Sequence, residues 1–268
     1  MEKIPLPSKI DIQPGKSKNE SIISIQPCHP GFGTTLGNAL RRVLLSSLPG
    51  GAVTAFKIKG VNHEFSAIPQ VKEDAVEIAL NLKQLRLKVY SDQPVRLEIK
   101  AKGEKKVTAK DIKSSSDVEV VNPDLLIATL TGKDAEFEME LIVSQGRGYV
   151  ATETREKENT EVDMILVDSI FTPIKNVGIS IENVRVGQMT NYENLILTIE
   201  TDGSITPQEA LDQATQVLIE HFQFINEQSQ TSAKPKKEKV EEKSEEAEEA
   251  EVEEKKPKKV KKSKKEDK

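Results

Sequence analysis

Cysteine is nearly absent from this sequence, since Cys28 is the only one among 268 residues. A single thiol excludes a disulfide within the chain and is typical of a reducing compartment. No stretch approaches the roughly 20 consecutive apolar residues of a membrane-spanning helix. The first residues also lack an apolar run as long as that of a signal peptide. We therefore expect a soluble, cytoplasmic protein.

Groupings typical of catalysis are missing as well. The histidines His29, His63 and His221 are far apart, and none has the spacing of a metal-binding motif. Cys28 and His29 are neighbours at the end of an expected strand, where adjacent side chains point apart, so they do not form a nucleophile pair. No clustered aspartates suggest a two-metal site. We expect no catalytic residue, no metal site and no cofactor.

One glycine-rich stretch, Gly146-Arg147-Gly148, resembles a phosphate-binding loop only weakly. It lacks the Lys-Ser/Thr pair of a P-loop and does not lead from a strand into a helix. We favour a tight turn that presents Arg147 and Tyr149. An enzyme with a phosphate site here is the less favoured alternative.

Charge is distributed unevenly along the chain. Residues 231–268 contain 14 Lys and 12 Asp or Glu, which leaves 25 basic and 32 acidic groups in residues 1–230. The mildly acidic first part argues against a protein whose main task is to grip nucleic acid. From about Ser229 the sequence is rich in Lys and Glu without an apolar stripe, so we expect disorder there. This tail is interpreted as a solubilising segment, with weak binding of polyanions as the alternative.

A helix is expected over residues 34–48, after a Gly-rich turn. Thr34 or Thr35 is the expected N-cap, and Pro49 with the two following glycines ends the helix. Gly37 lies inside the second turn, where glycine costs about 1 kcal/mol relative to alanine, so we expect something to approach the backbone there. The buried face is expected to comprise Leu36, Ala39, Leu40, Val43, Leu44 and Ser47. A second stripe of Asn38, Arg41, Arg42 and Leu45 fits either a solvated face or a recognition surface.

The remaining pattern predicts an α+β protein that is rich in strands. Residues 1–19 look like an extended lead-in, and residues 21–26 like a short strand that ends at Pro27. Residues 52–59 predict a further strand, and residues 73–85 an amphipathic helix. Residues 86–150 predict a β-rich module. Two antiparallel strands are expected at 177–186 and 194–201.

The last expected helix starts at Thr206, with Pro207 at its first position and Glu209 three residues after the cap. Apolar and weakly polar residues recur along it every three or four positions, at Leu211, Ala214, Leu218, His221 and Ile225, widened by Val217 and Phe222. A seam of this kind indicates a helix that packs on the core or on another chain.

Several motifs, in order along residues 10–228, closely resemble those of the α subunits of bacterial DNA-directed RNA polymerase. They are Gly31-Phe32-Gly33-Thr34-Thr35-Leu36-Gly37-Asn38-Ala39-Leu40-Arg41-Arg42-Val43-Leu44-Leu45-Ser46-Ser47, Gly60-Val61-Asn62-His63-Glu64-Phe65, Glu77-Ile78-Ala79-Leu80-Asn81-Leu82-Lys83, Gly146-Arg147-Gly148-Tyr149-Val150 and Leu166-Val167-Asp168. The resemblance implies a dimerisation subdomain, with an antiparallel sheet and two interface helices, from residues 1–50 and 176–228. It also implies an inserted, mostly β subdomain at 52–175, followed by the tail at 229–268.

The resemblance further implies a homodimer that assembles the polymerase β and then β′ subunits. The chain would belong to a transcription enzyme, a nucleotidyltransferase, without carrying its catalytic site, and would meet DNA only through the assembled enzyme. By position, the dimer interface would include Phe32, Leu36, Leu40, Val43, Leu218, Phe222 and Ile225. Arg42 and Leu45 match positions implicated in binding β, and Lys83 and Val167 positions implicated in binding β′.

Two departures from the family pattern stand out. Met189 replaces the usual arginine of the segment 185–191, which puts a polar contact there in doubt. The family's carboxy-terminal, DNA-contacting domain has no counterpart in the sequence, so we expect polymerase assembly without that mode of promoter reading. The alternative function is a stand-alone dimeric binding module whose charged tail binds nucleic acid or a partner.

Overall fold

The computed structural model describes residues 4–113, 115–155 and 163–232. Contacts divide the chain into residues 1–219 and residues 220–268. The first unit contains mostly antiparallel sheets together with α1 (Phe32–Ser46), α2 (Ala75–Lys83) and the beginning of α3 (Pro207–Ser232). Within its described residues, the second unit contains the end of α3. The α+β class expected from the sequence is confirmed.

A four-stranded sheet brings the two ends of the first unit together. Its order is β1 (Lys9–Pro14), β2 (Glu20–Cys28), β14 (Met189–Thr201) and β13 (Ile174–Val186), and all neighbours are antiparallel. The residues expected to be a lead-in therefore include an edge strand. β2 also continues past Pro27, through a cis peptide bond between Gln26 and Pro27.

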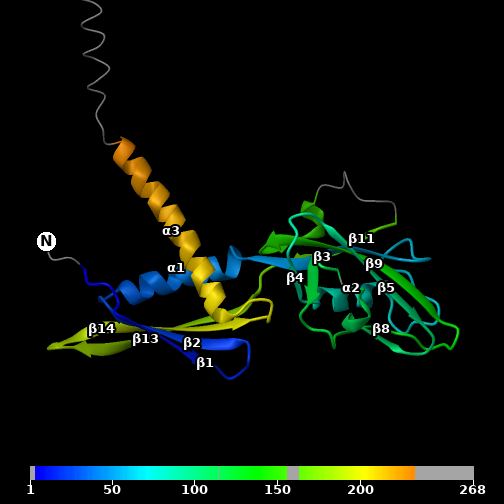
Figure 1. The fold of residues 1–268 in the computed structure, drawn as a ribbon, viewed down its shortest axis with the longest axis horizontal. Helices are drawn as coiled ribbons and strands as arrows, with labels where there is room; N and C mark the ends of the chain where they lie inside the picture. Colours follow the sequence, from blue (N-terminus) through cyan, green and yellow to red (C-terminus); the bar gives the residue numbers. More distant parts are fainter. Residues whose placement is uncertain (1–3, 114, 156–162, 233–268) are drawn as a thin grey trace, which may run out of the picture. The chain divides into compact units, whose positions relative to one another are not determined.

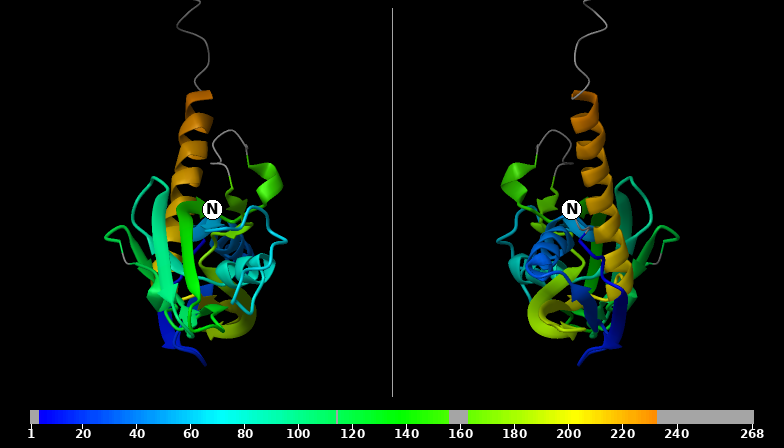
Figure 2. Two further views of the ribbon diagram at one scale, coloured as in Figure 1. Left: turned by 90° about the vertical axis from the view of Figure 1, so that its right-hand side faces the viewer. Right: turned by 90° about the vertical axis from the view of Figure 1, so that its left-hand side faces the viewer.

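The helix α1 lies on one face of this sheet (Figures 1 and 2). The register places Ile23 opposite Leu197 and Leu197 opposite Ile179, so these side chains share that face. Ile23, Leu197 and the α1 residue Leu44 are all fully buried. Their apolar cluster also receives Ala210, Leu211 and Ala214 from the first turns of α3. Burial against this sheet therefore fixes the inner faces of both helices.

A second, six-stranded sheet has its own apolar core. Its path is β5 (Val95–Lys102), β9 (Glu136–Arg147), β3 (Pro49–Ile58), β4 (Leu87–Val89) and β7 (Val118–Val120), and β11 (Ile165–Leu166) also pairs with β3. Two small sheets accompany it. They pair β6 (Lys106–Thr108) with β8 (Leu126–Thr129), and β10 (Tyr149–Val150) with β12 (Ser169–Ile170). The short helices η1 (Ala109–Asp111) and η2 (Thr152–Thr154) complete the described elements.

The helix α2 seals this core as the sequence predicts. Asp74 caps it, because its carboxylate accepts a 2.7 Å hydrogen bond from the backbone N–H of Glu77. Ala75 and Ile78 are fully buried, and Leu82 is 1% exposed. The predicted β-rich module is also present, because β4 to β10 all lie between residues 86 and 150.

Several boundaries differ from those expected. Pro49, Gly50 and Gly51 begin β3 instead of forming a sharp exit from α1. A side chain at Gly50 would collide with the carbonyl oxygen of Phe171, so this strand requires glycine for close packing. The β13–β14 hairpin turns at Gly187 and Gln188, which is tighter than the expected connection over residues 187–193. α3 continues to Ser232, into the segment expected to be disordered; the rest of that segment lies outside the described residues.

Candidate interaction surfaces

The N-terminus of α1 is closed by a residue from the neighbouring sheet. The two carboxylate oxygens of Glu193 accept hydrogen bonds of 2.8 Å each from the backbone N–H groups of Gly31 and Gly33. The expectation that Thr34 or Thr35 caps the helix is wrong. The Thr35 hydroxyl instead donates to the carbonyl oxygen of Gly31, at 3.2 Å, within the first turn. Because Glu193 lies far from α1 in the sequence, the residues around α1 give no indication that it caps the helix.

The close approach expected at Gly37 is confirmed. A Cβ atom there would lie 2.9 Å from Leu195 Cδ1 and 3.2 Å from Ile179 Cγ2. The side chains that approach the backbone of Gly37 thus come from the sheet of the same chain. Gly33 faces the same way, with Glu193 beside it. These two glycines, four residues apart, allow α1 to pack closely on β13 and β14.

The outer side of α1 separates into apolar and basic positions. Leu40 is 7% exposed and belongs to the core, so it packs on its own sheet. Leu36, Val43 and Leu45 are half-buried at the border of the same core. Arg41 and Arg42 are exposed, and neither guanidinium makes a hydrogen bond or ion pair within the part of the chain that the structure describes. Phe32 is 39% exposed, and its ring lies edge-on to that of His29 at 6.0 Å.

α3 begins with the predicted capping box. The Glu209 carboxylate accepts from the N–H of Thr206 at 2.9 Å, and the Thr206 hydroxyl accepts from the N–H of Glu209 at 3.2 Å. These contacts lower the pKa of Glu209, the backbone N–H of Thr206 having the largest effect. Further along, the exposed fractions are 62% for both Phe222 and Phe224 and 60% for Ile225. Phe224 was not included in the expected seam, although it lies three residues after His221, at helical spacing.

The two residues that the resemblance implicates in binding β′ lie near each other beside the second sheet. Lys83 and Val167 line one cavity of about 160 Å³, between α2 and the segment around β11. Val167 itself is 2% exposed and belongs to the core. The ammonium of Lys83 lies 2.9 Å from the Asp168 carboxylate. Asp168 was missed as a site residue, although it directly follows Val167 in a quoted motif.

The Gly146–Gly148 stretch is not the tight turn that the sequence favours, because Gly146 and Arg147 end β9 and the chain bends only at Gly148, before β10. Gly148 has a φ of +66°, and both Arg147 and Tyr149 are exposed. The Phe171 ring covers Gly146, at 2.8 Å from where a Cβ would lie, and the Phe171 N–H donates to the Gly148 carbonyl. Gly146 therefore makes room for an aromatic ring, whereas Gly148 allows the left-handed backbone of the bend.

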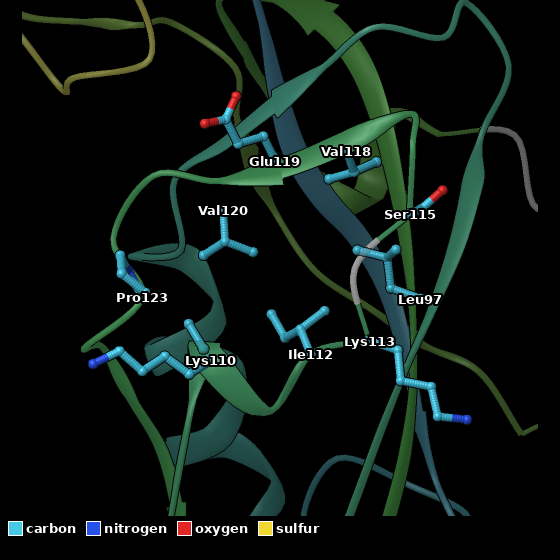
Figure 3. A pocket seen from close by; sticks show the side chains of 10 residues that line it. Leu97, Lys110, Ile112, Lys113, Ser115, Val118, Glu119, Val120 and Pro123 are labelled. Carbon is cyan, nitrogen blue, oxygen red and sulfur yellow. The ribbon is translucent and has the colours of Figure 1, made fainter.

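A further cavity, of about 330 Å³, lies below β7 (Figure 3). Figure 3 shows Val118, Val120 and Ile112 turned toward it, and the charged end of Glu119 turned away. Lys113 is already paired with Glu98, at 2.8 Å. This cavity is an apolar hollow that includes none of the residues singled out in the sequence.

Chemical groups suited to catalysis are not brought together in the described ranges. Cys28 is 1% exposed, and burial raises the pKa of its thiol. The neighbouring His29 packs against Phe32 and Tyr192. Within residues 4–113, 115–155 and 163–232, no group of three or more His, Cys, Asp or Glu could hold a metal ion. No helix in these ranges has both the length and the apolar character needed to cross a membrane.

Comparison with known proteins supports the resemblance. Residues 56–172 match the RNA polymerase Rpb3/RpoA insert domain. The DNA-directed RNA polymerase subunit alpha of Macrococcus caseolyticus is 52% identical over 197 residues, which cover 74% of this chain and 62% of that protein. The chain is thus similar to RNA polymerase α subunits over most of its own length.

Other α subunits give the same picture. The protein of Moorella thermoacetica is 51% identical over 197 residues, and that of Alkaliphilus oremlandii 49% over 198 residues. Each alignment covers 74% of this chain, and 63% and 62% of the respective relative. The chain therefore spans less than two thirds of the length of these α subunits. The resemblance drawn from the α1 and α2 motifs is confirmed.

Proposed function

We propose that the protein forms a homodimer that serves as the assembly platform for the β and β′ subunits of DNA-directed RNA polymerase in the cytoplasm. In this proposal the chain contributes to DNA-templated transcription as a non-catalytic subunit of a nucleotidyltransferase. It meets DNA through the assembled enzyme. The similarity to α subunits supports the proposal.

The exposed apolar end of α3 is the main observation that supports the proposed homodimer. Phe222, Phe224 and Ile225 each expose 60% or more of their surface. Contiguous exposed apolar side chains mark interaction sites, because covering them removes apolar surface from water. The interface would add Phe32, Leu36, Val43 and Leu218, which border the core or are exposed. Leu40 is buried against its own sheet, so it would contribute to the interface indirectly, by holding α1 in place.

The division into two subdomains fits the two separate apolar cores. One core runs from Val53 to Val167, and the other combines residues of β2 and α1 with residues of β13, β14 and α3. We assign residues 1–50 and 176–228 to dimerisation and residues 52–175 to an inserted β-rich subdomain. On this assignment the dimer and the β′ surface belong to different cores, so each can be altered without disturbing the other.

The two larger subunits would use different surfaces. Arg42, exposed on α1, and the half-buried Leu45 are proposed to bind β. Lys83 is proposed to bind β′ at the cavity that Val167 also lines. Because Val167 is almost fully buried, its contribution is to shape that cavity.

Co-expression of the full chain with β and β′ tests the proposal. We expect a dimer that purifies with both large chains, and the isolated protein to show two copies per particle by light scattering. A monomer that captures neither chain would overturn the proposal. A stand-alone module with a charged tail would instead bind nucleic acid, with an affinity that falls steeply with salt and is lost on truncation after residue 228.

A further inference from the structure

Lys83 and Asp168 form an ion pair between two distant parts of the chain. Lys83 is the last residue of α2, and Asp168 lies in the link between β11 and β12. Their charged atoms are 2.9 Å apart, and their side chains are 30% and 27% exposed. The pair is thus partly shielded from water, which makes it stronger than a fully exposed surface pair.

The backbone on both sides of Asp168 is anchored to β3. The N–H of Val167 donates to the carbonyl of Thr54 at 3.0 Å, and the hydroxyl of Ser169 donates to the carbonyl of Val53 at 2.6 Å. Val167 and Ser169 are buried, so the alternation of a strand turns Asp168 the other way. Its position is therefore set by the sheet and not by Lys83.

The Asp168 carboxylate also accepts a hydrogen bond from η2. Its Oδ1 accepts a 3.0 Å hydrogen bond from the N–H of Thr152, while Oδ2 faces Lys83. The hydrogen bond from Lys83, followed by that from Thr152, lowers the pKa of Asp168 to about 2. The group is therefore a fixed negative charge at neutral pH, with one oxygen for each partner.

This arrangement restricts a side chain that is otherwise mobile. A free lysine loses about 1.5–2 kcal/mol of conformational entropy when it is immobilised, so prior fixation lowers the cost of binding. The ammonium has three N–H donors, and Asp168 uses one. Beside it lies the cavity of about 160 Å³, whose lining includes Val76, Ala79 and the 52% exposed Leu80.

We infer that Asp168 is a positioning residue of the β′-binding surface: it holds the Lys83 ammonium beside this cavity, ready for an oxygen acceptor of the partner. The partner segment would offer a carbonyl or carboxylate oxygen next to an apolar side chain that enters the cavity. This inference rests on the proposed function. It adds Asp168 to the residues of the proposed β′ surface, and it names the chemistry of the partner segment that this surface would recognise.

The test is a double-mutant cycle on the full chain, co-expressed with β and β′. Asp168→Asn keeps an oxygen for the Thr152 N–H but removes the charge that holds Lys83. Lys83→Met keeps most of the stem and removes the ammonium. Glu136→Gln is the matched control, because it breaks another carboxylate–lysine pair, between β9 and β5, with Lys102 at 2.6 Å. Retention of β′ on the complex of α with β is measured, together with the thermal stability of each variant.

We expect Asp168→Asn to weaken β′ retention by about fivefold to tenfold, with β capture and the Glu136→Gln control unchanged. In the Lys83→Met background, Asp168→Asn should have no further effect on β′ retention, because it acts through the ammonium. Additive losses, or normal β′ retention by Asp168→Asn, would overturn the inference while leaving the β′ site in place. Normal β′ retention by Lys83→Met would instead remove the proposed β′ site itself.

Discussion

The carboxylate of Glu193 accepts a 2.8 Å hydrogen bond from the backbone N–H of Gly31, 162 positions earlier in the chain. Its second oxygen takes the N–H of Gly33 in the same way. The first N–H groups of a helix have no partner within the helix, and a negative charge there also suits the helix dipole. The start of α1 is therefore fixed by β14.

Removing this contact should destabilise the protein. We expect Glu193→Ala to lower the free energy of unfolding by about 1–2 kcal/mol, because it leaves two helix N–H groups without their acceptor. Urea unfolding followed by circular dichroism measures the change. Glu182→Ala, an exposed residue of β13, is the matched control and should stay within about 0.5 kcal/mol of the parent. Equal effects of the two changes would contradict the capping role.

The close contact at Gly37 predicts a change in stability opposite to the change that helix propensity predicts. Alanine should favour an isolated helix by about 1 kcal/mol. At Gly37, however, the new methyl group would lie 2.9 Å from Leu195 Cδ1, so we expect Gly37→Ala to cost about 1–3 kcal/mol of stability. Asn38→Ala, at the next and exposed position, should be neutral or stabilising. Thermal unfolding of the two variants decides between them.

The features that could be predicted from the sequence are those whose cause is local. The α3 capping box and the Asp74-capped α2 depend on residues within four positions of each other. The strands of the β-rich module follow from their alternation. The prediction of the α1 cap was wrong because the acceptor, Glu193, comes from a strand that pairs with β2 only in the folded protein.

Residues 1–19 and Leu40 show the same limit. Residues 1–19 are rich in turn formers and Leu40 is apolar, and both features are visible in the sequence. The pairing of Ile12 with Ile23 and the packing of Leu40 on the sheet, however, depend on tertiary structure. Asp168 was missed for this reason too. Its role depends on Lys83, which lies 85 positions earlier in the chain.

The apolar end of α3 should be required for dimerisation. We expect the double change Phe222→Ser and Ile225→Ser to convert the dimer to a monomer, since it removes apolar surface that the partner would cover. Light scattering at several protein concentrations measures the state. The exposed neighbour Gln223, changed to Ser, is the control and should remain dimeric. A stable dimer of the double variant would place the interface elsewhere.

The basic stripe of α1 should act separately from the dimer. We expect Arg42→Ala to leave the dimer intact and to weaken capture of β by about tenfold, because the guanidinium is exposed and free to pair with the partner. Arg147→Ala, another exposed arginine, should capture β normally. Co-purification of β with each variant measures the effect. Dissociation of the dimer by Arg42→Ala would contradict the assignment of separate faces on α1.

Stability should depend on pH through Asp168. Its pKa is lowered from 3.8 in the unfolded chain to about 2 in the folded one, so the folded state favours the charged form. That contribution is complete above about pH 5, and it is lost as pH falls from 3.8 through 2. The side chain is 27% exposed, and solvent screening reduces the contribution to about 1–2 kcal/mol. We therefore expect Asp168→Asn to be less stable than the parent by this amount at pH 7, and the difference to shrink as pH falls from 4 to 2.5. Urea unfolding of both proteins across this range measures it, and a difference that stays constant with pH would show that the charge of Asp168 is not its source.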